Sequence, residues 1–400
     1  MAFNPETENW SPATQAVRGG LDRTGFYETS EALFLNSGFV YDSAEAAERA
    51  FTGEDERFVY SRYGNPTVAT FQERLRLLEG TEACFATASG MSAVFTALGA
   101  LLAAGDRVVA ARSLFGSCFV ILNEILPRWG VETVFVDGPD LEQWREALSV
   151  PAQAVFFESP SNPMQEIVDI AAVSELAHAA GATVVADNVF ATPMLQRCTD
   201  LGADVVVYSG TKHIDGQGRV MGGAILGSKE FIDGPVKNLM RHTGPSLSSF
   251  NAWVLTKGLE TLDMRVRHSS ASALTLAGWL EQQPGVNWVK YPLLASHPQY
   301  ELAARQMSAG GTVLTFELAA LPGGTAKDAA FKLLNGLKIV DISNNLGDSK
   351  SLITHPATTT HRAMGAEGRA SIGLGDGVVR LSVGLEDVDD LIRDFQQALS

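Results

Sequence analysis

The sequence predicts an α/β protein with a mostly parallel, seven-stranded sheet flanked by helices, followed by a smaller α+β domain. Seven short apolar segments recur between residues 66 and 258, with helical segments between them. Several segments are unbroken apolar runs, such as Val205-Val-Val-Tyr208. Unbroken apolar strands are typical of a sheet covered on both faces, and alternation of strands with helices is typical of parallel pairing.

The expected elements of the large sheet follow in a regular order. Strands are predicted over residues 83–87, 107–111, 132–136, 154–157, 183–186, 204–208 and 224–226, with helices between them, for example over 91–104 and 170–180. Parallel strands joined by helical crossovers bring their carboxyl ends to one edge of the sheet. We therefore expect ligands to bind at that edge.

The pattern differs on either side of this region. After residue 259 we expect a long helix over 262–282, strands over 286–291, 312–318, 338–342 and 379–383, a helix near 326–334 and an amphipathic helix over 388–399. Residues 1–65 show no regular alternation. The sequence thus predicts an N-terminal arm over 1–65, a large domain over 66–258 that holds the expected ligand site, and a C-terminal α+β domain over 259–400.

Composition excludes several classes of partner. The chain of 400 residues has a formal net charge of −16, which repels a phosphate backbone, so we expect no nucleic-acid partner. No stretch approaches the roughly 18 apolar residues of a membrane span. The first residues contain neither the basic nor the apolar segment of a secretory signal. We therefore expect a cytoplasmic protein with no membrane contact.

Cysteines and histidines give no sign of a disulfide framework or a metal centre. Cys84, Cys118 and Cys198 are odd in number and far apart, so we expect reduced, mostly buried thiols. The seven histidines lack ligand spacing, and His355 and His361 are expected to be loop residues. The sequence predicts no metal.

Polar groups follow the predicted strands where a ligand site is expected. They are Asp187 after the strand at 183–186, Lys212 after 204–208, Asn162 after 154–157, and Ser89-Gly90-Met91 at the start of a helix. Taken singly, such residues are most often solvated loop side chains or helix caps. The loop 216–222 is not a dinucleotide-binding motif, because it lacks the GxGxxG spacing and no strand immediately precedes it.

Together these groups suit pyridoxal 5′-phosphate (PLP). The cofactor aldehyde needs a lysine amine, and its ring nitrogen needs a carboxylate that keeps it protonated. Its phosphate needs donors such as the free N–H groups of a helix start. Ser209 and Thr211 flank Lys212 and can add hydroxyl groups.

Longer motifs make the sequence similar to the Cys/Met-metabolism PLP enzyme family, and the resemblance covers nearly the whole chain. The motifs are Tyr60-Ser-Arg-Tyr-Gly-Asn-Pro-Thr67, Ala88-Ser-Gly-Met91, Glu158-Ser-Pro-Ser-Asn-Pro163, Asp187-Asn-Val-Phe-Ala-Thr-Pro193, Tyr208-Ser-Gly-Thr-Lys-His213, Ser249-Phe-Asn-Ala-Trp253 and Val379-Arg-Leu-Ser-Val-Gly-Leu-Glu386. The resemblance implies the fold-type-I architecture of PLP enzymes.

The resemblance also implies roles for matching residues. Lys212 would carry PLP as a Schiff base and shuttle protons, and Asp187 would pair with the ring nitrogen. Phosphate and ring contacts would come from Ser89, Gly90, Met91, Phe115, Asn162, Ser209 and Thr211. Arg380 would grip the substrate carboxylate with Asn162 and Ser343. Tyr60 and Arg62 would reach the phosphate of a neighbouring subunit, which implies shared active sites in a homo-oligomer, commonly a tetramer.

One position departs from the family pattern. Many members carry Tyr where this chain has Phe115, which can stack on the cofactor ring but has no hydroxyl. This weakens the prediction of a lyase. Any phenolic acid or base would then have to come from Tyr60.

The loop Gly347-Asp-Ser-Lys-Ser351 and the following Thr354–Thr360 segment look like those of the homoserine-ester sulfhydrylases, and the chain length favours the succinyl type. The implied reaction is γ-replacement of the succinyl group of O-succinylhomoserine by sulfide, giving homocysteine and succinate in methionine biosynthesis. We hypothesise that Lys350 favours the charged succinyl group. Open alternatives are an O-acetylhomoserine sulfhydrylase, a cystathionine γ-synthase or a γ-lyase, and, from another class, a non-catalytic PLP-fold binding protein.

Overall fold

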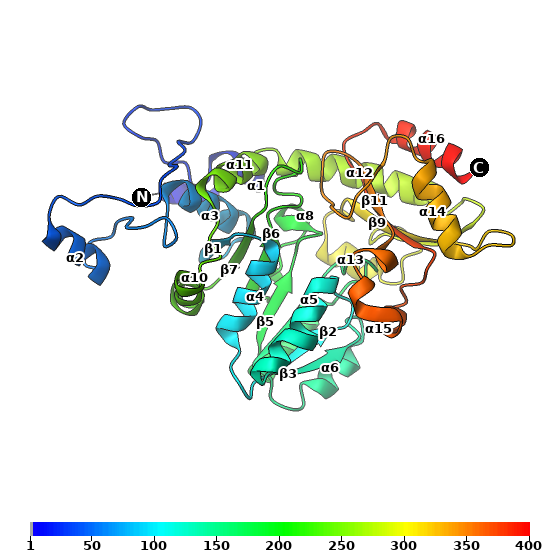
Figure 1. Cartoon of the computed structure of the whole chain (residues 1–400), viewed down its shortest axis with the longest axis horizontal. Coiled ribbons are helices and arrows are strands. Elements are labelled where there is room, and N and C mark those ends of the chain that lie inside the picture. Colours follow the sequence, from blue (N-terminus) through cyan, green and yellow to red (C-terminus); the bar gives the residue numbers. More distant parts are fainter. Residues whose placement is uncertain (1–2) are drawn as a thin grey trace.

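The computed structural model describes residues 3–400, and its largest element is a seven-stranded sheet (Figure 1). The strands lie side by side in the order β1-β7-β6-β5-β4-β2-β3. Their bounds are β1 Ala83–Thr87, β2 Arg107–Ala111, β3 Glu132–Val136, β4 Ala154–Glu158, β5 Thr183–Asp187, β6 Val205–Ser209 and β7 Gly223–Gly227. Each predicted strand begins and ends within one residue of these bounds.

Pairing in this sheet is mostly parallel, as predicted. Strands β3, β2, β4, β5 and β6 pair in parallel, whereas β7 runs antiparallel to both β6 and β1. Glu158 and Asp187, the last residues of β4 and β5, are partners in the parallel register. The two side chains therefore leave the sheet on the same face and at the same edge.

Helices cover both faces of the sheet. Successive residues of β5 fall into different cores. Val184 lies in the same core as residues of helices α3 (Pro66–Glu79), α7 (Ile170–Ala179) and α11 (Ser249–Leu259), and Val185 lies in the same core as residues of α4 (Gly90–Leu101) and α5 (Gly116–Val120). This explains the unbroken apolar strands. The helices of this half are α3 Pro66–Glu79, α4 Gly90–Leu101, α5 Gly116–Val120, α6 Leu141–Ala147, α7 Ile170–Ala179, α8 Thr192–Leu195, α9 Lys229–Phe231, α10 Lys237–Thr243 and α11 Ser249–Leu259.

A second sheet follows, with strand order β10-β11-β12-β9-β8 and its own apolar core. Its elements are α12 Leu262–Leu280, β8 Val286–Lys290, α13 Tyr300–Gln306, β9 Val313–Leu318, α14 Ala326–Gly336, β10 Asp341–Ile342, β11 Leu352–Thr354, α15 Gly365–Ser371, β12 Val378–Ser382 and α16 Val388–Leu399. The sequence did not predict β11, because three residues are too few to show a period. The domain boundaries at 65 and 258 stay a prediction.

Helix α12 joins the two halves through its packing. Leu262 and Val266, near its start, lie in the core of the large sheet, and Ala273 and Leu280, further along, lie in the core of the small sheet. A single rigid helix therefore holds the two sheets together and fixes the position of β12 against the large sheet.

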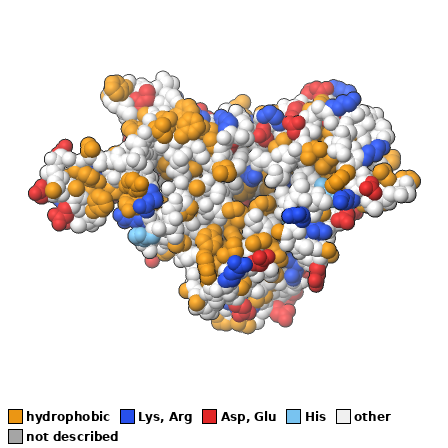
Figure 2. Space-filling view, viewed as in Figure 1, with side chains coloured by type: hydrophobic (Ala, Val, Ile, Leu, Met, Phe, Trp, Pro, Cys, Tyr) orange, Lys and Arg blue, Asp and Glu red, His pale blue; other side chains and the backbone are white. Residues whose placement is uncertain are grey.

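The N-terminal segment packs on the large domain through its first helix, where Ala16 is buried, and much of its later part, around residues 22–58, extends away from both sheets (Figure 1). It contains α1 Pro12–Arg18 and α2 Ala44–Thr52, and no residue of α2 is buried. Phe26, Tyr27 and Val40 are 93%, 83% and 89% exposed, and Figure 2 shows apolar side chains over this part of the surface. Across residues 3–400, no helix combines the length and apolar character needed to cross a bilayer.

Candidate active site

A cavity of about 290 Å³ lies at the carboxyl edge of the large sheet, as expected for parallel strands. The start of α4, the ends of β4, β5 and β6, and strand β12 all contribute to its wall. The predicted site residues that line it are Ser89, Gly90, Met91, Phe115, Asn162, Asp187, Ser209, Thr211, Lys212 and Arg380. Residues more than 290 positions apart in the sequence thus meet around one space.

Lys212 reaches the cavity from the loop that follows β6. Its Nζ donates a hydrogen bond to Asn345 Oδ1 at 2.7 Å. Burial, together with the nearby positive charge of Arg380, lowers the pKa of Lys212 to about 8. About a tenth of the amine is therefore neutral at pH 7, and the neutral amine is the form that attacks a carbonyl group.

Asp187 ends the neighbouring strand and points toward the same cavity. Its Oδ1 accepts a hydrogen bond from the backbone N–H of Val189 at 3.0 Å. Burial raises the pKa of Asp187 to about 7. Its accessible surface faces the cavity, so a cationic ring nitrogen bound there would favour the ionised carboxylate.

The start of α4 provides donors for an anion. Ser89 caps the helix, since its hydroxyl accepts from Ser92 N at 3.2 Å. The N–H groups of Gly90 and Met91 belong to the first turn, where no acceptor exists within the helix. A Cβ at Gly90 would lie 2.5 Å from the Cβ of Ser209, so this close approach requires glycine. The cradle therefore fits a phosphate group.

Thr211 lies beside this cradle but already has backbone partners. Its hydroxyl accepts from Gly222 N at 3.1 Å and lies 3.3 Å from Gly222 O. These contacts fix the loop that carries Lys212 against the start of β7, so Thr211 also has a structural role.

Arg380, in strand β12, also lines the cavity and is 1% exposed. Its Nη1 donates to Asn162 Oδ1 at 3.0 Å and its Nη2 to Asn344 O at 2.9 Å. Among the described residues its buried Nε has no acceptor. Burial lowers the pKa of Arg380 to about 10, which leaves the guanidinium charged at neutral pH. An unpaired, buried N–H of a held guanidinium is suited to binding a carboxylate.

Tyr60 and Arg62 do not line the cavity of their own chain. Tyr60 is 40% exposed, and the Arg62 guanidinium lies over the rings of Tyr60 and Tyr63, 5.3 and 4.8 Å from their centroids. Arg62 also donates to the carbonyl oxygen of Arg241. Within one chain the arm motif and the lysine site are separate.

The loop after β10 differs in detail from the sequence prediction. Ser343 does not line the cavity, and its Oγ accepts from Asn345 N at 3.2 Å. Asn344 and Asn345 make the contacts to Arg380 and Lys212 instead. Lys350 is also outside the lining, with an exposed side chain whose Nζ lies 3.5 Å from Asp348. Sequence alone gave no signal that distinguished these neighbouring loop positions.

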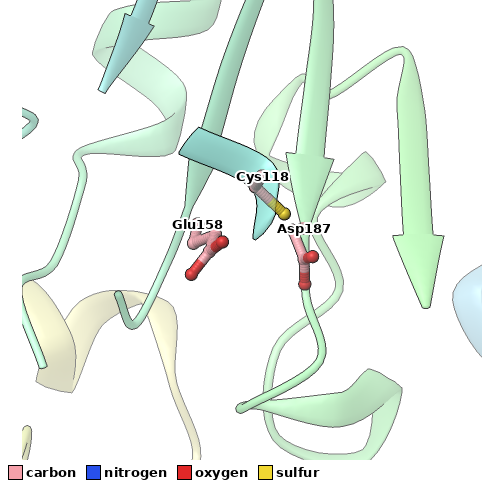
Figure 3. A group of neighbouring side chains, drawn as sticks. All are labelled: Cys118, Glu158 and Asp187. Atoms are coloured by element: carbon pink, nitrogen blue, oxygen red, sulfur yellow. The ribbon is translucent and has the colours of Figure 1, made fainter. Parts of the chain in front are cut away.

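Cys118, Glu158 and Asp187 form a group whose possible ligand atoms all lie within 4.8 Å of one another (Figure 3). A metal would require a thiolate, but burial and the neighbouring carboxyl groups raise the pKa of Cys118 well above its usual value. The donor set therefore favours a neutral thiol. The prediction that the protein uses no metal stays a prediction. All three cysteines are free and buried.

Sequence reasoning assigned no role to Glu158 or His361, although both contact predicted site residues. Glu158 Oε1 accepts from Phe115 N at 2.8 Å, and His361 Nε2 donates to Asn162 O at 3.1 Å. The position of Glu158 at the end of a strand next to that of Asp187 was a usable signal. No comparable signal pointed to His361.

This fold and this lysine–carboxylate–arginine cavity define an enzyme of the PLP-dependent class, and comparisons with known proteins agree. The model of the Cys/Met metabolism PLP-dependent enzyme family matches residues 13–400. An O-succinylhomoserine sulfhydrylase from Mycobacterium tuberculosis is 71% identical over 98% of this chain and 96% of its own length. A protein of the same name from Pseudomonas aeruginosa is 48% identical over 97% of this chain and 94% of its own length.

A solved structure from Campylobacter jejuni, described as an O-acetylhomoserine (thiol)-lyase and bearing a pyridoxyl-lysine phosphate, superposes with a TM-score of 0.92. It is 30% identical and covers 98% of this chain and 100% of its own. The chain belongs to the Cys/Met-metabolism family of PLP-dependent enzymes, and PLP is its cofactor.

Proposed function

We propose that this enzyme replaces the succinyl group of O-succinylhomoserine by sulfide and so forms homocysteine and succinate. The cavity carries the proposal, because Lys212 and Arg380 line one space and supply an amine beside a carboxylate-binding group. The choice of substrate is supported by the relatives from M. tuberculosis and P. aeruginosa, which bear that name at 71% and 48% identity.

The cofactor fits the donor groups of the cavity. Gly90, Met91 and Ser209 would hold its phosphate, Asp187 its ring nitrogen, and Phe115 would lie against its ring. When bound, PLP withdraws electrons from the substrate α-carbon and so makes the attached proton acidic. The remaining chemistry requires that the protein transfer protons and orient the substrate.

Lys212 would make these proton transfers. With its pKa at about 8, the amine can accept the α-proton and return a proton near neutral pH. Asn345 accepts a hydrogen bond from Nζ and would hold the amine when it is not bonded to the cofactor. The Phe115 ring has no proton to give, so the departing succinate would leave without a phenol from this position.

Arg380 would orient the substrate by its α-carboxylate. The guanidinium is held by Asn162 and by the Asn344 carbonyl, so its direction is fixed before substrate arrives. Pre-organised, charge-assisted hydrogen bonds of this kind are strong and directional. Sulfide needs only space near the γ-carbon, whereas cysteine would need a second carboxylate-binding group.

We also propose that Tyr60 and Arg62 complete the cavity of a second copy of the chain, in a homo-oligomer that is at least a dimer and, as in much of the family, a tetramer. Their separation from the cavity of their own chain and the exposed apolar side chains Phe26, Tyr27 and Val40 support this. A cytoplasmic location and the absence of a nucleic-acid partner stay predictions.

Mass spectrometry of the products tests the proposed function. Purified protein with PLP receives O-succinylhomoserine or O-acetylhomoserine, each with sulfide or cysteine. We expect homocysteine from the succinyl ester with sulfide to exceed every other product. Dominant homocysteine from the acetyl ester would make it an O-acetylhomoserine sulfhydrylase, and dominant cystathionine would make it a γ-synthase. Release of 2-oxobutanoate without an acceptor would indicate a lyase, and no product at all would favour a binding protein.

A further inference from the structure

Glu158 is a buried acid at the cavity that the proposed chemistry does not use. It is 4% exposed and lies beside Asp187 at the edge of the sheet (Figure 3). Within residues 3–400, no lysine or arginine forms a salt bridge with either carboxyl group. Two adjacent, buried acids without a cation between them are costly if both are ionised.

The two oxygen atoms of Glu158 contact two different segments of the cavity wall. Oε1 accepts from the backbone N–H of Phe115 at 2.8 Å, and Oε2 accepts from that of Asn162 at 3.2 Å. Phe115 supplies the ring that faces the cofactor space, and the Asn162 side chain holds Arg380. One carboxyl group therefore aligns the cofactor-facing and the substrate-facing segments.

The charges around Glu158 indicate which acid of the pair is ionised. Burial, and then the charge of Asp187, raise the pKa of Glu158 well above its usual value, and they outweigh the hydrogen bonds from Phe115 N–H, Asn162 N–H and Cys118, which lower it. Cys118 in α5 is neutral for the reason given above, and the cations that line the same cavity are Lys212 and Arg380. A protonated cofactor ring would add its positive charge at Asp187. If the two carboxyl groups hold one proton between them, that proton is then on Glu158.

We propose that Glu158 is a positioning residue that, as a neutral acid, aligns the Phe115 and Asn162 segments and leaves the single negative charge of the pair on Asp187. The proposal rests on the proposed function, because it takes Asp187 as the partner of the cofactor ring. It goes beyond that function by assigning a charge state and a role to a residue that touches neither substrate nor cofactor in the proposed scheme.

Two substitutions separate the charge of Glu158 from its hydrogen bonds. Glu158→Gln removes any negative charge but keeps the shape and an acceptor for Phe115 N–H. Glu158→Ala removes both and leaves two buried N–H groups without acceptors. Glu175→Gln is the matched control, because Glu175 is an exposed residue of α7. Thermal unfolding of each variant shows whether it has folded.

The charge is measured directly by infrared difference spectroscopy of wild type against E158Q at neutral pH. We expect the wild type to show the carbonyl stretch of a protonated carboxyl group that E158Q lacks. A carboxylate band in its place would overturn the proposal. The spectra are recorded on the PLP-loaded proteins, because the charge of the cofactor ring helps to place the proton on Glu158. The measurement does not need turnover, so it remains decisive if E158A fails to fold or if the enzyme uses another substrate.

The effect of the Glu158 charge on the bound cofactor is measured on the holoenzyme. We expect the pH midpoint of the cofactor absorption to differ by less than about 0.3 unit between E158Q, E175Q and wild type, because no charge has been removed. A shift of about one unit in E158Q alone would show that Glu158 is ionised and contradict the proposal. Wild type that binds no PLP and forms no homocysteine would refute the proposed function instead.

The alignment is measured by visible circular dichroism of the bound cofactor and by steady-state kinetics. We expect E158A to change the dichroism through the Phe115 segment and to raise KM for the homoserine ester about tenfold through the Asn162 segment, the cost of the one unsatisfied buried donor on the substrate side. E158Q keeps an acceptor for Phe115 N–H and should restore the dichroism, whereas its amide NH2 cannot accept from Asn162 N–H, so its KM should lie between those of wild type and E158A. If E158A folds and leaves dichroism and KM unchanged, Glu158 does not position these segments.

Discussion

The carboxyl edge of the large sheet and the N-terminal arm both carry motifs of the family, yet only the first forms a site within one chain. Lys212, Asp187 and Arg380 line one cavity, whereas Tyr60 and Arg62 lie in an exposed segment whose apolar side chains face solvent. Buried strands and one long helix hold the first region. Under the proposed pairing, the arm motif acts only together with a second copy of the chain, although it is as specific in sequence as the motifs of the core.

The largest effect is expected for Lys212→Ala. The variant should lose on the order of 10⁴-fold in kcat, since both the covalent attachment and the proton transfers depend on this amine. Borohydride reduction of wild type with PLP should add a stable cofactor mass to the peptide that contains Lys212, and K212A should gain none. Lys338→Ala, at an exposed position, serves as the control. Near-normal turnover by K212A would show that the reaction does not take place in this cavity.

The next largest effect is expected for Arg380→Ala, which tests the substrate side of the same cavity. Loss of the charge-assisted hydrogen bonds to the carboxylate should lower kcat/KM about 100-fold, mainly through KM. PLP affinity should change little. Arg145→Ala, on the surface of α6, is the comparison variant. A fall in kcat with unchanged KM would show that Arg380 does not bind the ground-state substrate.

Capture of PLP by the apoprotein should depend on pH. The pKa of Lys212 is lowered to about 8, so the neutral, reactive fraction of the amine rises with pH, is one half near that value and is nearly complete about one unit above it. The capture rate should therefore rise about tenfold between pH 7 and a plateau above pH 8 to 9. Stopped-flow absorbance measures it. A rate that kept rising to pH 10.5 would mean that the site leaves the lysine pKa at its ordinary value.

The smallest effect is expected for Lys350→Ala. Its ammonium group is exposed, lies near Asp348 and does not line the cavity, so screening should limit its effect on the succinyl-to-acetyl preference to about twofold. Competition between the two esters, analysed by mass spectrometry, measures this. A tenfold loss of preference would place the loop over the succinyl group and restore a direct role for Lys350.

Regular periodicity made the large sheet predictable, because each strand is buried on both faces and ends in a polar residue. The same strand ends gave Asp187, Lys212 and Asn162 as site residues. Strand β11 and the contacts of Asn344 and Asn345 were not predictable, because short loop segments take their conformation from tertiary packing. Glu158 is part of a motif that the sequence shows, but its role could not be predicted, because that role depends on the register of β4 with β5.

The comparison also separates residues that line the cavity of their own chain from residues that are proposed to line the cavity of a second chain. The proposed pairing places Arg62 of one chain near the phosphate cradle of the other. An Arg62→Ala enzyme should therefore bind PLP more weakly, by about tenfold, whereas Arg49→Ala, on exposed α2 of the same arm, should not.

Mixing K212A with an impaired arm variant, at a PLP concentration too low to saturate that arm variant, tests the shared site most directly. K212A and a Tyr60→Phe, Arg62→Ala double variant are each purified, mixed in equal amounts under conditions that exchange subunits, and assayed for homocysteine. Hybrid dimers contain one site with both native regions, so the mixture should recover about a quarter of wild-type activity. Activity that stayed at the sum of the two separate variants after confirmed subunit exchange would show that each chain completes its own site, contrary to this account.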